Sequence, residues 1–136
     1  MSVETDDELR EILDLETIAV VGCSSTAGKA AHDVPAYMQR HGYEIIPVNP
    51  YADEILGRTA VDSLADVEEK IDIVDVFRPS EEVAGIVDAV LEREDVAVVW
   101  MQLGIEDDEA AARAEDAGHS VVQDRCLKVE HQRLVD

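Results

Sequence analysis

In Thr17-Ile18-Ala19-Val20-Val21-Gly22, an apolar and largely β-branched stretch runs up to a glycine. Its length and composition predict a strand buried on both faces, as in a parallel sheet. Residues 23–31 are small and polar, which predicts a loop. A helical stripe follows at Val34, Tyr37, Met38 and His41. We expect this helix to carry Pro35 in its first turn and to stop at Gly42.

The rest of the chain continues this alternation of strands and helices. Further strands are predicted at residues 43–48, 71–77, 96–101 and 120–122. Helices are predicted at residues 6–13, 63–69, 80–91 (with Ser80 as N-cap) and 106–117, and a final turn or helix at 127–134. No linker or repeat interrupts the pattern, so residues 1–136 are expected to form one domain. The alternation predicts an α/β fold: a Rossmann-like, doubly wound, mostly parallel five-stranded sheet with helices on both faces.

The charge of the chain limits its partners. The 136 residues include 32 Asp and Glu but only 11 Lys and Arg, for a formal net charge of −21. A hydrophobic content of 46% is enough to build a core, so the charge does not indicate disorder. It excludes a nucleic acid gripped over a broad face and disfavours an anionic membrane surface. Evenly spread acids with only three Lys favour an acidic, halophilic protein of a salty cytoplasm over an ordinary acidic bacterial protein.

Targeting and metal-binding signals are weak. The sequence has no run of 18 apolar residues, so no transmembrane helix is expected. Residues 1–10 are polar and acidic, unlike a signal peptide. Cys23 and Cys126 are too few for a disulfide framework and lack metal-ligand spacing. These features predict a cytoplasmic protein with reduced thiols and without a metal site.

The ligand site follows from the fold class. In open α/β sheets, ligands bind beyond the carboxyl ends of the strands, where the strand order reverses. This rule selects residues 22–29, 49–50, 78–79 and 102–104. The first segment is neither a P-loop nor a Gly-x-Gly-x-x-Gly motif, because five residues separate Gly22 from Gly28 and position 24 is Ser. Its hydroxyls and Lys29 before a helix still suit a phosphate, and a flexible turn with a solvated Lys is the alternative.

Two of the other segments bear on the kind of nucleotide. The strand that ends at Asn49-Pro50 lacks the acidic residue that holds the ribose of NAD, so NAD becomes a weaker candidate. After the third strand, Arg78 can bind a phosphate bidentately, and Phe77 can flank an adenine or pack in the core. The alternative for Arg78 is an ion pair with one of the many acids. Trp100 is expected in the core.

Short motifs along the chain resemble those of the small, single-domain CoA-binding proteins. In order from Ile18 to Glu130, they are Gly22-Cys23-Ser24, Lys29, Gly42-Tyr43, Pro47-Val48-Asn49-Pro50, Asp72-Ile73-Val74-Asp75-Val76-Phe77-Arg78, Trp100-Met101-Gln102-Leu103-Gly104-Ile105 and Asp124-Arg125-Cys126-Leu127-Lys128. That family is similar to the CoA-binding domain of the succinyl-CoA synthetase α subunit. The resemblance implies a Rossmann-like domain that binds coenzyme A through its ADP portion. The implied cofactor-binding residues are Gly22, Ser24, Ser25 and Lys29 at the phosphates, Asn49, Pro50, Phe77, Arg78 and Pro79 beside the nucleotide, and Gln102 and Gly104 across the cleft.

The resemblance also bears on activity. Family members generally stand alone and lack the synthetase's phosphohistidine and grasp domains, which implies binding of CoA or an acyl-CoA without catalysis and no catalytic residue. Many members have Ser where this chain has Ala31, so the phosphate contacts are expected to differ. One alternative is a thiol-linked role, with a mixed disulfide between CoA and Cys23 or Cys126; a packed, unreactive Cys23 competes with it. An NAD(P)- or nucleotide-binding oxidoreductase is another. The expected partner is a small nucleotide cofactor, with no nucleic acid and no membrane, and a protein partner is left open.

Overall fold

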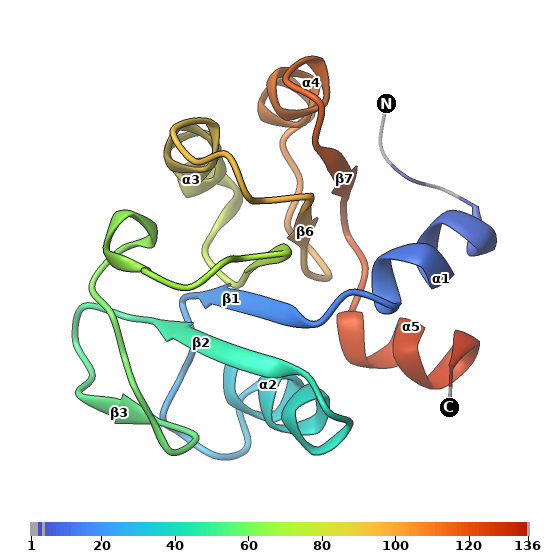
Figure 1. Cartoon of the computed structure of the whole chain (residues 1–136). Helices are drawn as coiled ribbons and strands as arrows, with labels where there is room; N and C mark the ends of the chain where they lie inside the picture. Colours follow the sequence, from blue (N-terminus) through green and yellow to red (C-terminus); the bar gives the residue numbers. More distant parts are fainter. Residues whose placement is uncertain (1–2, 4, 136) are drawn as a thin grey trace.

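Five parallel strands form the central sheet (Figure 1). In spatial order they are β2 (Glu44–Val48), β1 (Thr17–Val21), β5 (Ile73–Val76), β6 (Val98–Met101) and β7 (Ser120–Val122). The structure is a computed structural model that describes residues 3 and 5–135; residues 1, 2, 4 and 136 lie outside this description. The predicted five-stranded, doubly wound parallel sheet is confirmed.

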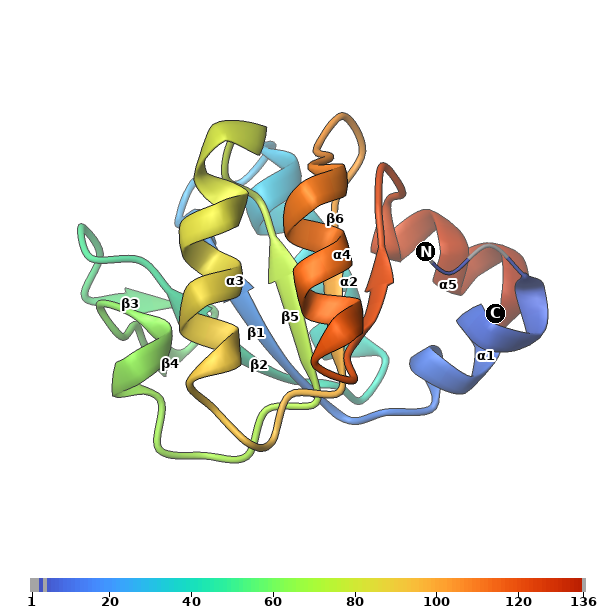
Figure 2. The same ribbon diagram turned by 90° about the horizontal axis from the view of Figure 1, so that it is seen from above.

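Helices cover both faces of this sheet (Figures 1 and 2). One face carries α1 (Asp6–Leu13), α2 (Ala30–Arg40) and α5 (Leu127–Leu134), and the other carries α3 (Val83–Leu91) and α4 (Asp108–Asp116). Side chains along β1 alternate between the two cores, because Ile18 and Val20 point to the α2 face and Ala19 to the α3 face. Among the described residues, none of the helices is long and apolar enough to cross a membrane.

The strand order reverses between β1 and β5. From β1 the chain moves outward to β2 and then returns to β5 on the other side of β1. The segments that follow these strands therefore diverge at their carboxyl ends, which is where a ligand cleft is expected. β5 is two residues shorter at its start than predicted. Directly before it, the Asp72 carboxylate accepts hydrogen bonds from Glu16 N and Thr17 N at 3.1 and 3.0 Å.

The start of α2 differs from the prediction in a way that concerns the first loop. The helix begins at Ala30, so Pro35 lies in its second turn rather than in the first. Proline has no N–H and cannot donate to the carbonyl of Ala31, four residues before it. Ser24 N donates to that carbonyl instead, at 3.0 Å. The carbonyl of Ala31, which Pro35 leaves without its helical donor, therefore holds the loop that follows β1.

Two other predicted helices differ from the structure, one in its length and one in its start. Only Leu64–Asp66 of the predicted helix at 63–69 is helical, as a single 3-10 turn, and Arg93 Nη1 donates to the carbonyl of Leu64 at 2.7 Å. Ser80 does not cap α3 through its side chain; the turn Ser80–Glu82 is 3-10, and the Ser80 hydroxyl accepts a hydrogen bond from Glu106 N at 3.1 Å.

A small antiparallel hairpin beyond β2 was not predicted. It consists of β3 (Glu54–Ile55) and β4 (Arg58–Thr59), which turn through Leu56 and Gly57 at φ values of +54° and +78°. Strands of two residues carry no periodic pattern that a sequence could reveal. The hairpin extends the connection between β2 and β5 and so helps to set the outer wall of the site described next.

Candidate functional site

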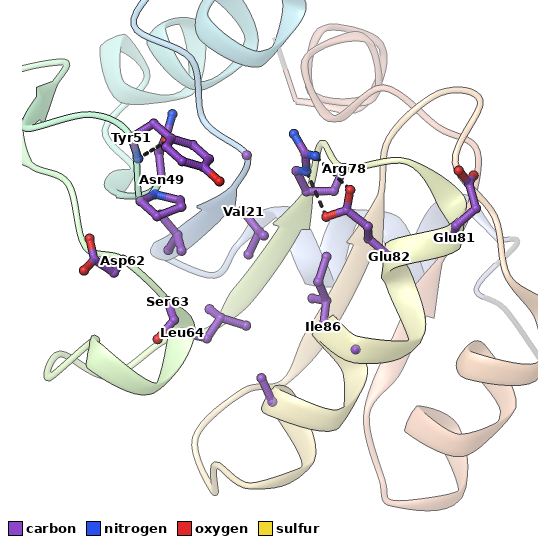
Figure 3. A pocket seen from close by; sticks show the side chains of 15 residues that line it. Val21, Asn49, Tyr51, Asp62, Ser63, Leu64, Arg78, Glu81, Glu82 and Ile86 are labelled. Carbon is purple, nitrogen blue, oxygen red and sulfur yellow. Dashed lines mark hydrogen bonds and ion pairs between the residues drawn. The ribbon is translucent and has the colours of Figure 1, made fainter.

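A cleft of about 680 Å³ opens at the carboxyl edge of the sheet, on the face that carries α3 (Figure 3). One wall is formed by residues 48–51 and 62–64, which follow β2 and the hairpin. The opposite wall is formed by the turn Ser80–Glu82 and by α3. Apolar side chains, among them Leu64 and Ile86, line its inner surface. The cleft lies at the reversal of strand order, where the fold predicts a ligand.

Gly22 stands at the centre of this edge, directly after β1. Its φ is +87°, in the left-handed region that favours glycine. A Cβ atom at this position would lie 2.8 Å from Cδ of Arg78, so the aliphatic part of Arg78 crosses the glycine at close range. Gly22 N donates to the carbonyl of Val48 at 3.0 Å, which holds the end of β1 against β2. The glycine is therefore required both by the backbone and by the path of Arg78.

Arg78 carries its guanidinium to the opening of the cleft, where it pairs with Glu82. Arg78 Nε donates to Glu82 Oε1 at 3.1 Å, and Nη2 donates to Oε2 at 2.7 Å. Both side chains are half exposed, at 48%. The shared hydrogen bonds raise the pKa of Arg78 and lower the pKa of Glu82. The ion pair that was the alternative to phosphate binding is therefore present, and it occupies one edge of the guanidinium.

Asn49 connects the loops that follow β1 and β2. Its side-chain amide donates to the carbonyl of Cys23 at 2.8 Å, and its side-chain oxygen accepts a hydrogen bond from Tyr51 N at 2.8 Å. With Pro50 between them, these bonds fix the turn at the edge of the cleft. Tyr51 is 95% exposed, and its ring lies across the opening from Arg78 (Figure 3). Asn49 and Pro50 thus line the cleft, with the Asn49 side chain engaged in shaping it.

The loop with Ser24, Ser25 and Lys29 lies at the start of α2, on the other face of the sheet, and does not line the cleft. The Ser24 hydroxyl accepts a hydrogen bond from Thr26 N at 3.0 Å, which folds the loop on itself. Lys29 is the exposed N-cap of α2, and its side chain caps no amide there. Asp33 Oδ1 accepts a hydrogen bond from Gly28 N at 3.1 Å. These predicted phosphate residues and Arg78 consequently stand on opposite sides of Gly22.

The remaining predicted residues lie outside the cleft lining. Phe77 packs against the core on the α2 face, and Pro79 precedes the turn Ser80–Glu82. Gln102 is buried, and its side-chain oxygen accepts a hydrogen bond from Leu127 N at 3.1 Å, so it caps α5. Gly104, at φ +84°, donates from its N to Asp124 Oδ1 at 2.6 Å. Gln102 therefore ties the end of β6 to the start of α5, and Gly104 ties it to the loop between β7 and α5.

The cleft also contains residues that the sequence did not indicate. These are Val21, Val48, Tyr51, Asp62, Ser63, Leu64, Glu81, Glu82, Gly85, Ile86 and Ala89. The carboxyl-end rule selects the tips of strands, but it does not say which face of the sheet the cleft occupies. The regular spacing of Glu82, Ile86 and Ala89 on one side of a helix is the signal that could have identified the α3 wall.

The buried acid Asp75 and the thiol of Cys23 lie on the α2 face beneath the loop. Both residues are fully buried. Burial, with a smaller contribution from the Asp75 charge, raises the pKa of the Cys23 thiol to about 12. Burial also raises the pKa of Asp75 well above its usual range, and within the described residues its carboxyl oxygens have no hydrogen-bond partner. Cys23 is therefore a poor thiolate, which weakens the thiol-linked alternative at this position; Cys126 is only partly buried.

Comparisons with known proteins identify relatives along nearly the whole chain. A family described as a CoA binding domain matches residues 16–132. The chain is 46% identical over 125 residues to the uncharacterized protein YneT of Bacillus subtilis, covering 91% of this chain and 92% of YneT. The fold is shared with the solved structure of the Thermus thermophilus protein known as cell-free ID.343, with a TM-score of 0.91 and 42% identity over 96% of this chain and 99% of that one.

A further relative is much longer than this chain. The ADP-forming acetate–CoA ligase of Methanocaldococcus jannaschii is 33% identical over 75 residues. The match covers 55% of this chain but only 11% of the ligase. The similarity therefore concerns one region of a large enzyme.

Proposed function

Because this chain belongs to the CoA-binding domain family, we propose that it binds coenzyme A, or an acyl-CoA, through the ADP portion of the cofactor. The observation that carries the proposal is the cleft: an apolar inner surface with a guanidinium at its opening lies where the strand order reverses. An adenine is favoured by an apolar slot and a phosphate by a cation, and the cleft offers both.

The ligand would cross the edge of the sheet at Gly22. The adenine would lie in the cleft between Leu64 and Ile86, and the pyrophosphate would pass over Gly22 toward Ser24 and Lys29 at the start of α2. The N-terminus of α2 favours negative charge because its first amide groups and the helix dipole point toward the loop. This route accounts for predicted residues on both sides of Gly22 with a single extended ligand.

We infer that the chain contributes binding rather than chemistry. Among the residues that the structure describes, those that line the cleft include no Cys, His or Lys, the side chains that most often act as nucleophiles or proton carriers near neutral pH. The ligase activity of the archaeal relative belongs to a protein of which this chain matches 11%. Chemistry on the bound cofactor, where it occurs, would then be supplied by another protein.

Isothermal titration calorimetry with CoA, acetyl-CoA, ATP and NAD tests the proposal. We expect saturable binding of CoA and acetyl-CoA and weaker binding of NAD. Tight NAD binding without CoA binding would overturn the assignment in favour of the oxidoreductase alternative. Lys29→Ala should weaken CoA binding by about tenfold, the range for a lost charge-assisted hydrogen bond. Lys70→Ala, which removes an exposed lysine paired with Asp72 at the opposite edge of β5, is the matched control.

A steric variant locates the adenine without changing any charge. Apart from the backbone of its own helix and its chain neighbours, no atom lies within 4 Å of a Cβ placed on Gly85, so a larger side chain at this position of α3 would extend into the cleft. Gly85→Leu also improves helix propensity, so the fold should be kept. We expect it to weaken CoA binding at least about tenfold by overlap with the base. Ala84→Leu, on the adjacent exposed position outside the cleft, should bind CoA as the unmodified protein does.

A further inference from the structure

The guanidinium of Arg78 is engaged by Glu82 in a defined geometry. Two nitrogens, Nε and Nη2, each donate to a different oxygen of the Glu82 carboxylate. The aliphatic part of Arg78 passes over Gly22 at close range, and the guanidinium beyond it lies at the opening of the cleft. Figure 3 shows Glu82 turned toward Arg78, whereas its neighbour Glu81 is turned away. An anion that is to bind Arg78 through the same edge must therefore displace Glu82.

The charged side chains that line the cleft oppose this displacement. Within the described part of the chain, Arg78 is the one cation that lines the cleft, while Asp62, Glu81 and Glu82 are acids. The chain as a whole carries a formal charge of −21. An incoming anion is repelled by all three carboxylates and attracted only by a guanidinium that already has a partner. The anion displaces Glu82 only if it binds the guanidinium more strongly than the Glu82 carboxylate does.

Phosphate groups differ in what they offer. A phosphodiester has one negative charge and two free oxygens, like the carboxylate that it would replace. A phosphomonoester carries a charge of about −1.5 to −2 at neutral pH and three acceptor oxygens. Both groups can bind an arginine bidentately, but only the monoester brings more charge than Glu82.

We propose that Arg78 and Glu82 together select a ligand with a phosphomonoester, and that Glu82 is the specificity-determining residue that a weaker anion does not displace. This inference rests on the proposed function, because the ADP portion of CoA carries a phosphomonoester on its ribose. Dephospho-CoA lacks that group and is otherwise identical to CoA. NAD likewise has only the pyrophosphate linkage, which has no terminal phosphate.

The test compares the dissociation constants of CoA and dephospho-CoA by calorimetry. The unmodified protein should bind CoA at least about tenfold more tightly, the range for hydrogen bonds to a charged group. Arg78→Lys keeps the charge but loses the two-pronged donor, and the preference should fall below about threefold. With Glu82→Gln, the pyrophosphate of dephospho-CoA no longer has to displace a carboxylate from Arg78, so dephospho-CoA should gain more affinity than CoA and the preference for CoA should fall by about two- to fivefold. Thermal unfolding of each variant verifies the fold.

Glu81→Gln is the matched control, since it removes the same charge from the same cleft without touching the pair. This variant should change the dissociation constants of CoA and dephospho-CoA by similar factors, so that the ratio of the two constants stays the same. The inference is overturned if Glu82→Gln alters the ratio no more than Glu81→Gln does, or if Arg78→Lys keeps the full preference. Equal, tight binding of both ligands by the unmodified protein overturns this inference alone, whereas binding of neither overturns the proposed function as well.

Discussion

Replacing Asp75 by Asn should change how the stability of the protein depends on pH. Asp75 lies on the central strand β5, between Val20 of β1 and Trp100 of β6, and is fully buried. Within the described residues no donor reaches its carboxyl oxygens. A buried polar group without a partner costs about 1–3 kcal/mol, and an ionised one costs more. Asn has nearly the same shape but cannot ionise, so it isolates the effect of the charge.

The sign follows from the raised pKa of Asp75. Below its unfolded pKa of about 3.9, the carboxyl is protonated in both states and pH has no effect through this group. Above that value the unfolded chain releases the proton while the folded chain keeps it. The protein therefore loses about 1.4 kcal/mol of unfolding free energy per pH unit, relative to Asp75→Asn, until the pH reaches the folded pKa of Asp75. The advantage of the variant should grow across this window and then level off.

Urea denaturation of both proteins at several pH values from about 4 to 8 measures this difference directly. Asp72→Asn, at the residue directly before β5, is the control of opposite sign. Burial raises the pKa of Asp72, but hydrogen bonds from Thr17 N and Glu16 N and the ammonium of Lys70 outweigh it and lower the pKa. Asp72→Asn should therefore be destabilised at neutral pH, with the deficit shrinking as the pH falls below about 4. Parallel curves for Asp75→Asn and the unmodified protein would refute the reasoning.

Three further predictions address the loop, the thiols and the charge. Gly22→Ala should lower the unfolding free energy, measured in urea, by about 1–3 kcal/mol and weaken CoA binding, because the new side chain meets a left-handed φ and a close contact with Arg78. Gly57→Ala is the control: at φ +78° in open space it should lose only the stability that the backbone strain costs, and CoA binding should be kept. At about pH 8, a thiol reagent should label Cys126 in the native protein and Cys23 only after unfolding, because burial raises the pKa of Cys23 to about 12. Intact-mass measurements follow the labelling, and equal labelling rates of the two cysteines would contradict this prediction. The melting temperature should rise between about 0.1 M and 1 M KCl as salt screens a formal charge of −21, and full stability at low salt would rule out the halophilic interpretation.

The sheet could be predicted because its strands are buried on both faces. A strand such as Thr17–Val21 must be apolar along its whole length, which leaves a clear mark in the sequence. The helices are almost as clear in the sequence, because each buries one stripe of apolar side chains. The hairpin Glu54–Ile55 and Arg58–Thr59 left no such mark, since it is too short to show a period. The start of α2 was misjudged because proline is common in a first turn, and the donor that satisfies the carbonyl left free by Pro35 comes from Ser24, eleven positions earlier.

The strand ends that form the candidate site could be predicted, but the side chains that line its surface could not. The position of Gly22, Asn49, Pro50 and Arg78 at the cleft follows from the rule for parallel sheets. The engagement of Arg78 by Glu82 depends on a local 3-10 turn and on side-chain rotamers, which the sequence does not specify. The burial of Gln102 against α5 depends on the packing of two segments about 25 residues apart. Such tertiary contacts decide which polar residue faces a ligand and which supports the fold.

The hydrogen bond between Ser24 N and the carbonyl of Ala31 has a consequence for how firmly the first loop is held. In a helix without proline, the amide four residues later would compete with the loop for this carbonyl. The loop would then be anchored only for the fraction of time in which the helix gave up its own bond. Pro35 removes that competitor by its covalent structure, so the loop gains its acceptor without taking a bond from α2.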